Sequence, residues 1–135
     1  MSVPTDAPAV TGIPRLLLRL EGAALLLLSL LLFHRLGESW WLFAILFLAP
    51  DLSFAGYLGG ARIGSIVYNA AHTTIAPAVL ALLGLLLPAF VLVALAVIWF
   101  AHIGMDRMLG YGLKYGAGFG FTHLGLVGRL PPSPS

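Results

Sequence analysis

Two ionisable side chains, His102 and Asp106, lie four residues apart near the end of a long apolar stretch. On an α-helix this spacing places both side chains on one face, one turn apart. Ionisable groups are costly inside a bilayer, so they normally face the interior of a helical bundle or a water-filled cavity. The pair is therefore the first candidate for a functional site.

Earlier apolar stretches carry polar residues that could join this pair. Glu21 lies in the first stretch, Asp51 in the second and His72 in the third. If the four stretches cross a membrane in turn, all of these residues fall in the same half of the bilayer. Carboxylates and neutral imidazoles suit Zn, Mn or Fe, and bundle cores can hold such ions between facing helices. Three carboxylates and two imidazoles at one depth therefore predict a divalent metal site.

Four other polar residues receive supporting roles. Glu21 is the candidate catalytic residue, as a general base or else as a further ligand. Tyr68 and Asn69 are candidates to orient a ligand or the substrate. His123 could join the site only if the segment after the last helix folds back over it.

The same residues also allow explanations without a metal. His102 and Asp106 could form a simple hydrogen-bonded pair, and the acids could form ion pairs with Arg62 and Arg107. Three acids in apolar surroundings would repel one another unless they are protonated or bind a cation. This repulsion favours the metal site.

The composition places the chain in a membrane. Of the 135 residues, 60% are hydrophobic and 9% are charged, whereas roughly a quarter of the residues of a soluble domain are charged. The absence of cysteine excludes disulfides, thiolate metal sites and a cysteine nucleophile. The net charge of +2 is too small and too scattered to indicate a nucleic-acid partner.

The elements that must position these residues are four apolar segments, each about long enough to cross a hydrocarbon core of ~30 Å. We predict an all-α fold, an integral membrane bundle of four transmembrane helices within residues 14–110. Pro50 and Pro77 predict kinks in the second and third helices, because proline lacks the amide hydrogen that a helix needs. The predicted spans are 16–34, 40–58, 63–84 and 88–108.

The ends of the chain differ from this bundle. We expect a mobile tail at 1–13, an interfacial flap rich in glycine and aromatic residues at 111–128, and a disordered tail at 129–135. All lysines and arginines except Arg35 fall on the side of the two termini. The positive-inside rule therefore predicts that both termini are cytoplasmic, in a bacterial inner membrane.

Three motifs carry a resemblance to a known family: the segment 68–72, which ends in His72, the segment 101–115 around His102 and Asp106, and the segment 122–125 around His123. The chain resembles a family of small bacterial membrane proteins known only as a domain of unknown function. The resemblance covers nearly all of residues 21–125. It implies membership of that family and brings no activity with it.

A looser similarity concerns the order of the polar motifs. Pro-Asp at Asp51, His-Thr at His72 and the His102/Asp106 pair on successive helices are similar to the layout of membrane-bound metal-dependent hydrolases. That similarity implies metal-ligand roles for the four residues. The chain departs from the hydrolase pattern in two places. Leu52-Ser53 stands where the hydrolases have a longer acidic run, and Tyr68-Asn69 stands where the hydrolases have an arginine just after a histidine.

The leading hypothesis is a metal-dependent hydrolase that acts on an amphiphilic, lipid-like substrate, such as a lipid phosphate or ester, near the cytoplasmic face. One alternative is a small ion-handling or transport protein with a proton or cation relay, although residues 75–100 offer such a relay almost no polar lining. Another is a structural subunit that uses its polar residues for ion pairs and packing. Membrane lipid is the expected partner, and the sequence leaves the oligomeric state open.

Overall fold

The structure, a computed structural model, describes residues 10–111, 113, 121–122 and 125–126. A short antiparallel pair of strands, β1 (Phe121–Thr122) and β2 (Gly125–Leu126), pairs Phe121 with Leu126. Everything else of regular structure in the described part is helical, which confirms the predicted all-α fold. The helices are α1 (Gly12–Leu36), α2 (Trp40–Leu46), the 3₁₀ helix η1 (Ala49–Gly59), α3 (Ala61–His72), α4 (Ile75–Leu86) and α5 (Phe90–Leu109).

These helices form four spans that are long and apolar enough to cross a membrane. The second span combines α2 with η1 and the third combines α3 with α4, so the spans are Gly12–Leu36, Trp40–Gly59, Ala61–Leu86 and Phe90–Leu109. The shortest of them has 20 residues, and a helix of that length covers about 30 Å, the thickness of the hydrocarbon core. The chain is an integral membrane protein, with the predicted number of spans.

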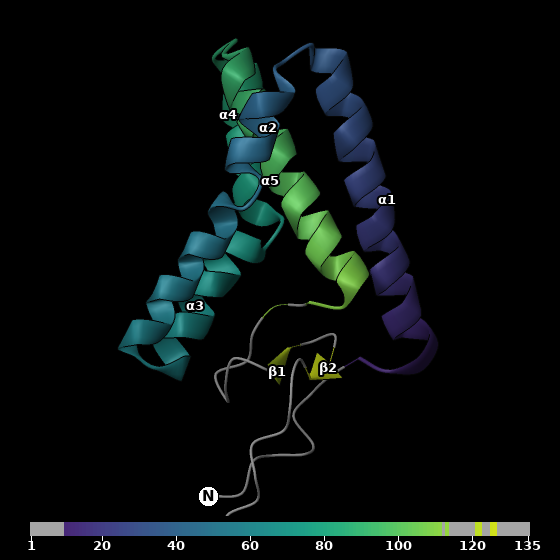
Figure 1. Cartoon of the computed structure of the whole chain (residues 1–135), viewed down its shortest axis with the longest axis vertical. Coiled ribbons are helices and arrows are strands. Elements are labelled where there is room, and N and C mark those ends of the chain that lie inside the picture. The colour runs from purple at the N-terminus through teal and green to yellow at the C-terminus, as the bar shows by residue number, and fades with distance from the viewer. Residues whose placement is uncertain (1–9, 112, 114–120, 123–124, 127–135) are drawn as a thin grey trace, which may run out of the picture.

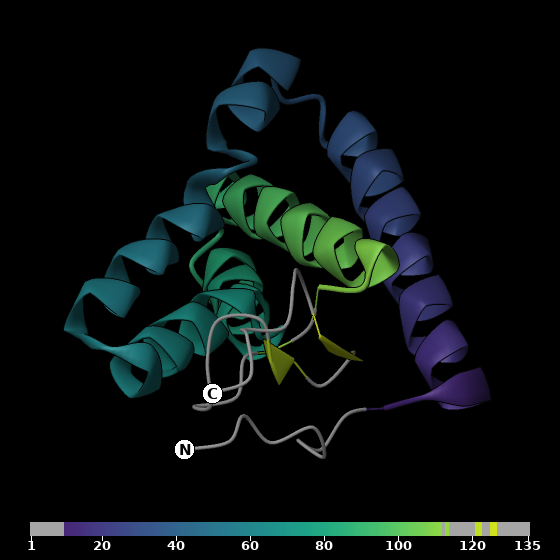
Figure 2. The same cartoon turned by 60° about the horizontal axis from the view of Figure 1, so that its bottom comes forward.

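The spans are arranged as two diverging arms (Figure 1). α1 packs along α5 in one arm, and η1 packs along α3 in the other. α4 packs against α5 where the arms meet, and Figure 2 shows α5 lying between α1 and the other arm. α5 is therefore the central element of the molecule, and its middle residues are the most deeply buried.

Two glycines allow α1 and α5 to approach closely. A Cβ atom added to Gly104 of α5 would lie 2.7 Å from the backbone nitrogen of Leu26, and one added to Gly22 of α1 would lie 2.5 Å from Cβ of Arg107. Small residues at such contacts let helix backbones pack tightly in a membrane, where lipid removes the hydrophobic driving force. Arg19 of α1 adds a hydrogen bond from its Nε to the Met108 carbonyl, at 2.8 Å.

The second and third spans are each interrupted ahead of a proline. α2 ends at Leu46, four residues before Pro50, and α3 ends at His72, with Thr73 in an extended conformation (φ −81°, ψ 145°) four residues before Pro77. A proline cannot donate to the carbonyl four residues earlier, and its ring collides with that carbonyl. The kinks predicted from the two prolines are found as complete breaks.

Side chains of α5 satisfy the carbonyls that the break in the third span leaves free. Nε1 of Trp99 donates to the Ala71 carbonyl at 2.6 Å, and a guanidinium nitrogen of Arg107 donates to the His72 carbonyl at 3.3 Å. Unpaired carbonyls are costly at membrane depth, where no water can replace the lost bonds. These two bonds attach the broken span to the central helix.

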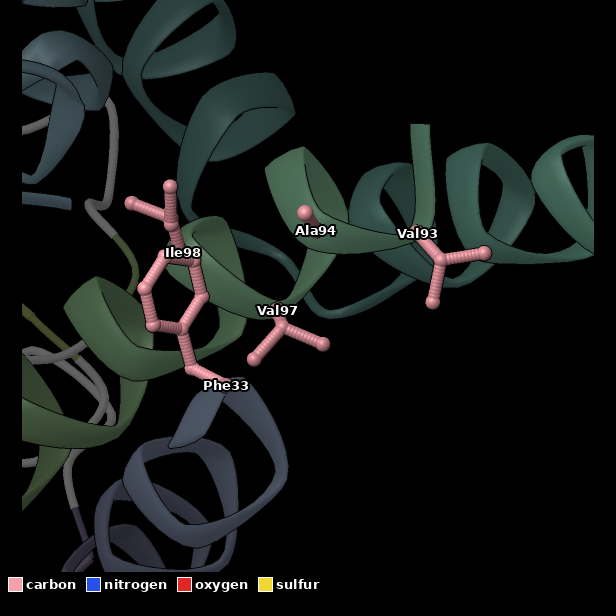
Figure 3. Close-up of a cluster of buried hydrophobic side chains, with 5 residues drawn as sticks. All are labelled: Phe33, Val93, Ala94, Val97 and Ile98. Carbon is pink, nitrogen blue, oxygen red and sulfur yellow. The ribbon is translucent and has the colours of Figure 1, made fainter. Parts of the chain in front are cut away.

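An apolar cluster holds the arms together at the end where they meet. Phe33 of α1 packs against Val93, Ala94, Val97 and Ile98 of α5 (Figure 3). The Phe33 ring also makes edge contacts with the rings of Trp40 and Phe43 in α2, at centroid distances of 4.9 Å and 5.2 Å. This core fixes α1, α2 and α5 relative to one another and leaves the polar residues below it on α5.

Candidate metal centre

The two breaks bring polar residues of the second and third spans to α5. Asp51 lies in the first turn of η1, directly after the break at Pro50, and His72 is the last residue of α3. His102 and Asp106 lie one turn apart on α5. One ligand atom from each of these four side chains lies within 4.8 Å of the corresponding atoms of the other three.

Five of the six separations within this cluster are short and nearly equal. Nε2 of His102 lies 3.1 Å from Oδ1 of Asp51 and 3.2 Å from Oδ2 of Asp106. Nε2 of His72 lies 3.3 Å and 3.4 Å from the same two oxygens. The two Nε2 atoms are 3.2 Å apart. The four atoms therefore surround a single point.

This spacing fits a tetrahedral metal ion. Zinc binds imidazole nitrogen and carboxylate oxygen at about 2.0–2.1 Å, which puts tetrahedral ligands about 3.3–3.4 Å apart. The five separations in the cluster run from 3.1 Å to 3.4 Å. Five of the six separations thus match those that one tetrahedral ion requires, and the sixth, between the two carboxylate oxygens, is at most 4.8 Å.

The hydrogen bonding of His72 explains why a cation suits the cluster. Its Nδ1 donates to the Tyr68 carbonyl at 2.9 Å, so in the neutral ring Nε2 carries a lone pair. That lone pair faces the carboxylate oxygens of Asp51 and Asp106. Groups that only accept hydrogen bonds repel one another unless a proton or a metal ion lies between them. A metal-binding histidine usually donates its other ring nitrogen in this way.

The cluster is closed on the α5 side and open on the η1 side. The side chains of His102 and His72 are 0% and 3% exposed, whereas those of Asp106 and Asp51 are 13% and 33% exposed. Asp51 is therefore the ligand through which another molecule could reach the centre.

Aromatic rings hold the two imidazoles in place. The Tyr68 ring stacks on the His72 ring at a centroid distance of 3.7 Å, and the Phe54 ring stacks on the Tyr68 ring at 5.2 Å. Phe47 meets the His102 ring edge-on at 5.6 Å. Phe47 and Phe54 were missed in the sequence, although both lie within one turn of Asp51.

The structure does not bring Glu21 to the cluster, and the expectation that it turns inward is wrong. Glu21 is exposed on α1, whereas its neighbour Gly22 is buried against Arg107 of α5. Successive residues of an α-helix point about 100° apart because a turn has 3.6 residues. The close packing at Gly22 therefore turns Glu21 away from α5.

The remaining candidates have different outcomes. Tyr68 contacts His72 through both its carbonyl and its ring. Asn69 is half-buried one residue further along α3, and its carbonyl accepts the amide of Thr73 at 2.8 Å. His123 lies outside the described residues, as does most of the predicted flap.

The competing explanation by ion pairs with arginine finds little support in the described part of the chain. There, neither Arg62 nor Arg107 lies within 4.0 Å of a carboxylate oxygen, and the ion pairs of Asp51 and Asp106 are with the two histidines. Arg107 instead donates to the His72 carbonyl. In this part of the chain, the charge of the two acids is therefore left for the histidines or for a cation between the four side chains to balance.

The fold and the site define a small integral membrane protein with four spans and a cluster of two histidines and two aspartates that could hold a metal ion. Residues 15–127 match the family model described as Domain of unknown function (DUF4260), and the chain belongs to this family. No curated protein and no solved structure matches the chain. Family membership is confirmed, while the looser similarity to membrane-bound hydrolases has no counterpart in these comparisons.

Proposed function

We propose that this protein is a metal-dependent hydrolase that acts on an amphiphilic substrate within the membrane. The observation that carries the proposal is the set of four donor atoms within 4.8 Å of one another, five of whose six separations are 3.1–3.4 Å, with the His72 lone pair directed at two carboxylates. Two nitrogens and two oxygens are a donor set for Zn, Mn or Fe. With a further coordination position on the exposed Asp51 side, a divalent ion held by these residues would polarise the bond to be cut and lower the pKa of the attacking water.

Asp51 is the residue best suited to act as general base. Its Oδ1 faces the two histidines, and as it is the most exposed of the four ligands, its second oxygen, Oδ2, would be left to take the proton of the attacking water. The oxygen of water would bond to the acyl carbon or the phosphorus of the substrate, and the bond to the leaving oxygen would break. The leaving oxygen then takes up the proton that Asp51 removed from water, so no oxidant or reductant is needed.

The distribution of basic residues supports an orientation for the site. Arg19 donates to the Met108 carbonyl at the end of α5, and a Cβ atom on Gly110 would lie 3.1 Å from a guanidinium nitrogen of Arg15. Basic residues therefore gather where α1 begins and α5 ends. By the positive-inside rule this side faces the cytoplasm, in a bacterial inner membrane, and the substrate comes from the surrounding lipid.

A second candidate function, ion or proton handling, is favoured by one feature. The ligands Asp51 and His72 lie at breaks in two spans, and transporters commonly bind ions at such discontinuous helices. The other half of the bundle is lined by the apolar residues of α4 and the first half of α5, which offers an ion no path onward. We therefore place hydrolysis first.

Metal analysis of detergent-purified protein tests the proposal. We expect stoichiometric Zn, Mn or Fe in the wild type and in His34→Ala, which removes an exposed histidine far along α1. The double variant His72→Ala/His102→Ala should lose the metal and, with it, hydrolysis of p-nitrophenyl esters and p-nitrophenyl phosphates that carry an alkyl chain. A protein without metal would overturn the proposal. Stoichiometric metal without hydrolysis would leave a structural metal site in its place.

A further inference from the structure

A pocket of about 290 Å³ lies beside the metal centre, at the middle of the second, third and fourth spans. Its volume is near the lower end of the roughly 300–1,000 Å³ found for ligand pockets. We call it the tail pocket. It is lined by Leu46 and Pro50 at the first break, Ser53 of η1, Ala71 of α3, and Leu95 and Trp99 of α5.

The walls of the tail pocket offer almost no polar group to an occupant. Ser53 and Trp99 are the polar side chains among the lining residues, and the structure uses the donor of each elsewhere. The Ser53 hydroxyl donates to the Pro50 carbonyl at 2.7 Å, and Nε1 of Trp99 donates to the Ala71 carbonyl at 2.6 Å. A polar occupant would lose its hydrogen bonds with water and gain few in return. The chemistry of the walls therefore selects hydrocarbon.

The tail pocket adjoins the metal centre through the chain itself. Pro50 directly precedes Asp51, and Ala71 directly precedes His72. On α5, Trp99 lies less than one turn before His102. None of the four ligands lines the pocket itself, but on three spans a lining residue lies within one turn of a ligand, so a molecule that fills the pocket would lie next to the cluster.

The direction of the pocket matches the orientation of a lipid. On the second span, Leu46, Ala49 and Pro50 precede Asp51 and only Ser53 follows it. On α5, all three lining residues precede His102. Most of the lining on these two spans therefore lies toward the start of each span. Both spans begin at the end of the bundle opposite to the start of α1 and the end of α5 (Figure 1). From the cluster, the pocket therefore extends away from the basic end of the bundle, as a lipid tail extends away from its headgroup.

We infer that the tail pocket holds one hydrocarbon chain of a membrane amphiphile whose hydrolysable polar group lies at the metal centre. This inference rests on the proposed function and narrows its substrate to amphiphiles from the leaflet on the basic side. The small volume restricts the pocket to a single chain, because a two-chain lipid would have to leave its second chain in the surrounding bilayer.

Trp99 provides a probe of occupancy that does not depend on hydrolysis. The chain has three tryptophans, so the double variant Trp40→Phe/Trp41→Phe leaves Trp99 as the single fluorophore. In non-brominated detergent, we expect an amphiphile with a brominated alkyl chain to quench Trp99 saturably, and the unbrominated analogue to compete. In the same background, Ala71→Leu fills the pocket and should weaken this binding by about tenfold. Ala78→Leu makes the same change on the exposed face of α4 and should bind like the parent.

Leu95→Ala tests the pocket in the opposite direction, in case Ala71→Leu disturbs the fold. It enlarges the pocket, so we expect the chain length of tightest binding to increase. Quenching that grows linearly with the amount of brominated amphiphile, and is equal in all variants, would overturn the inference. Binding is measured alongside the metal analysis of the same preparation. Saturable binding by a protein that takes up no metal would overturn the proposed function and leave the pocket standing.

Discussion

The α1–α5 arm and the η1–α3 arm each supply two ligands to the metal centre, but they position them by different means. In α5 an uninterrupted helix places His102 and Asp106 on one face through its own periodicity. In the other arm, Asp51 and His72 lie next to breaks, and prolines determine where those breaks occur. The α1–α5 arm depends on close helix packing to turn its two ligands inward. The η1–α3 arm, the broken arm, depends instead on α2 and α3 ending at the right residues.

This difference predicts distinct failures for the two arms. A change that separates α1 from α5 should reduce the stability of the whole bundle, because α5 contacts both arms. A change at a break should leave the bundle folded and displace a ligand. The substitutions below test this distinction in order of decreasing expected effect.

Gly104→Leu should have the largest effect. A side chain at residue 104 has no space, since even its Cβ would lie 2.7 Å from the backbone of Leu26. We expect the variant to lose about 3 kcal/mol of stability or more, at the upper end of the cost of overpacking, and to lose bound metal as a consequence. Thermal unfolding in detergent measures the change. Ala24→Leu, on the exposed face of α1, is the control, and equal stability of the two variants would show that the close contact of α1 with α5 is unimportant.

Pro77→Ala should affect metal binding more than stability. The substitution gives residue 77 an amide hydrogen that can donate to the Thr73 carbonyl. α3 and α4 can then join into one helix. The His72 side chain would then rotate away from the cluster, and we expect metal affinity to fall by about 10- to 100-fold, as for other changes in the support of a ligand. Equilibrium metal titration measures this, with Pro88→Ala, beyond the end of α4, as the control. Unchanged affinity would mean that the contacts of α5 maintain the break without the proline.

The same contrast explains what the sequence could predict. The four-residue spacing of His102 and Asp106 gave the α5 half of the centre, and Pro50 and Pro77 marked the breaks that carry the other half. Glu21 was misplaced because it lies in a leucine-rich helix whose apolar residues surround it on all sides, so polarity did not mark the packed face. Gly22 could have marked the face of α1 that packs against α5, since a small residue allows two helices to approach closely.

The aromatic supports and the tail pocket were harder to predict from the sequence. The indole of Trp99 reaches the Ala71 carbonyl 28 residues away, a contact that depends on how two spans pack. Phe47 and Phe54 read as ordinary lipid-facing residues of an apolar segment. Such contacts depend on how the spans pack in three dimensions, so the local sequence pattern does not predict them.

Removing the Tyr68 ring should have a smaller effect, confined to the broken arm. Tyr68→Ala keeps the backbone carbonyl that accepts from His72 and deletes the ring stacked on the imidazole. An aromatic contact of this kind contributes about 0.5–1.5 kcal/mol, so we expect metal affinity to fall by up to about tenfold. Metal titration is again the measurement. Ile66→Ala, on the exposed face of α3, should bind metal like the wild type, and a similar loss in both variants would argue against a role for the ring in orienting His72.

Trp99→Phe should have the smallest effect, on the free energy of unfolding. It tests how the third span, made of α3 and α4, is attached to α5. The change removes the donor to the Ala71 carbonyl at the break, and a hydrogen bond between membrane helices contributes about 0.6 kcal/mol on average and up to about 1.7 kcal/mol. Trp41→Phe, at an exposed position in α2, is the control for loss of an indole.

Combining Trp99→Phe with Pro77→Ala sharpens this test. If Pro77→Ala joins α3 and α4, the Ala71 carbonyl gains the amide of Ile75 as a helical partner and no longer needs the indole. The cost of Trp99→Phe should then vanish in the Pro77→Ala background, and a double-mutant cycle of unfolding free energies would report that coupling. Additive effects would show instead that the Trp99 hydrogen bond stabilises the contact between the spans whether or not the third span is broken.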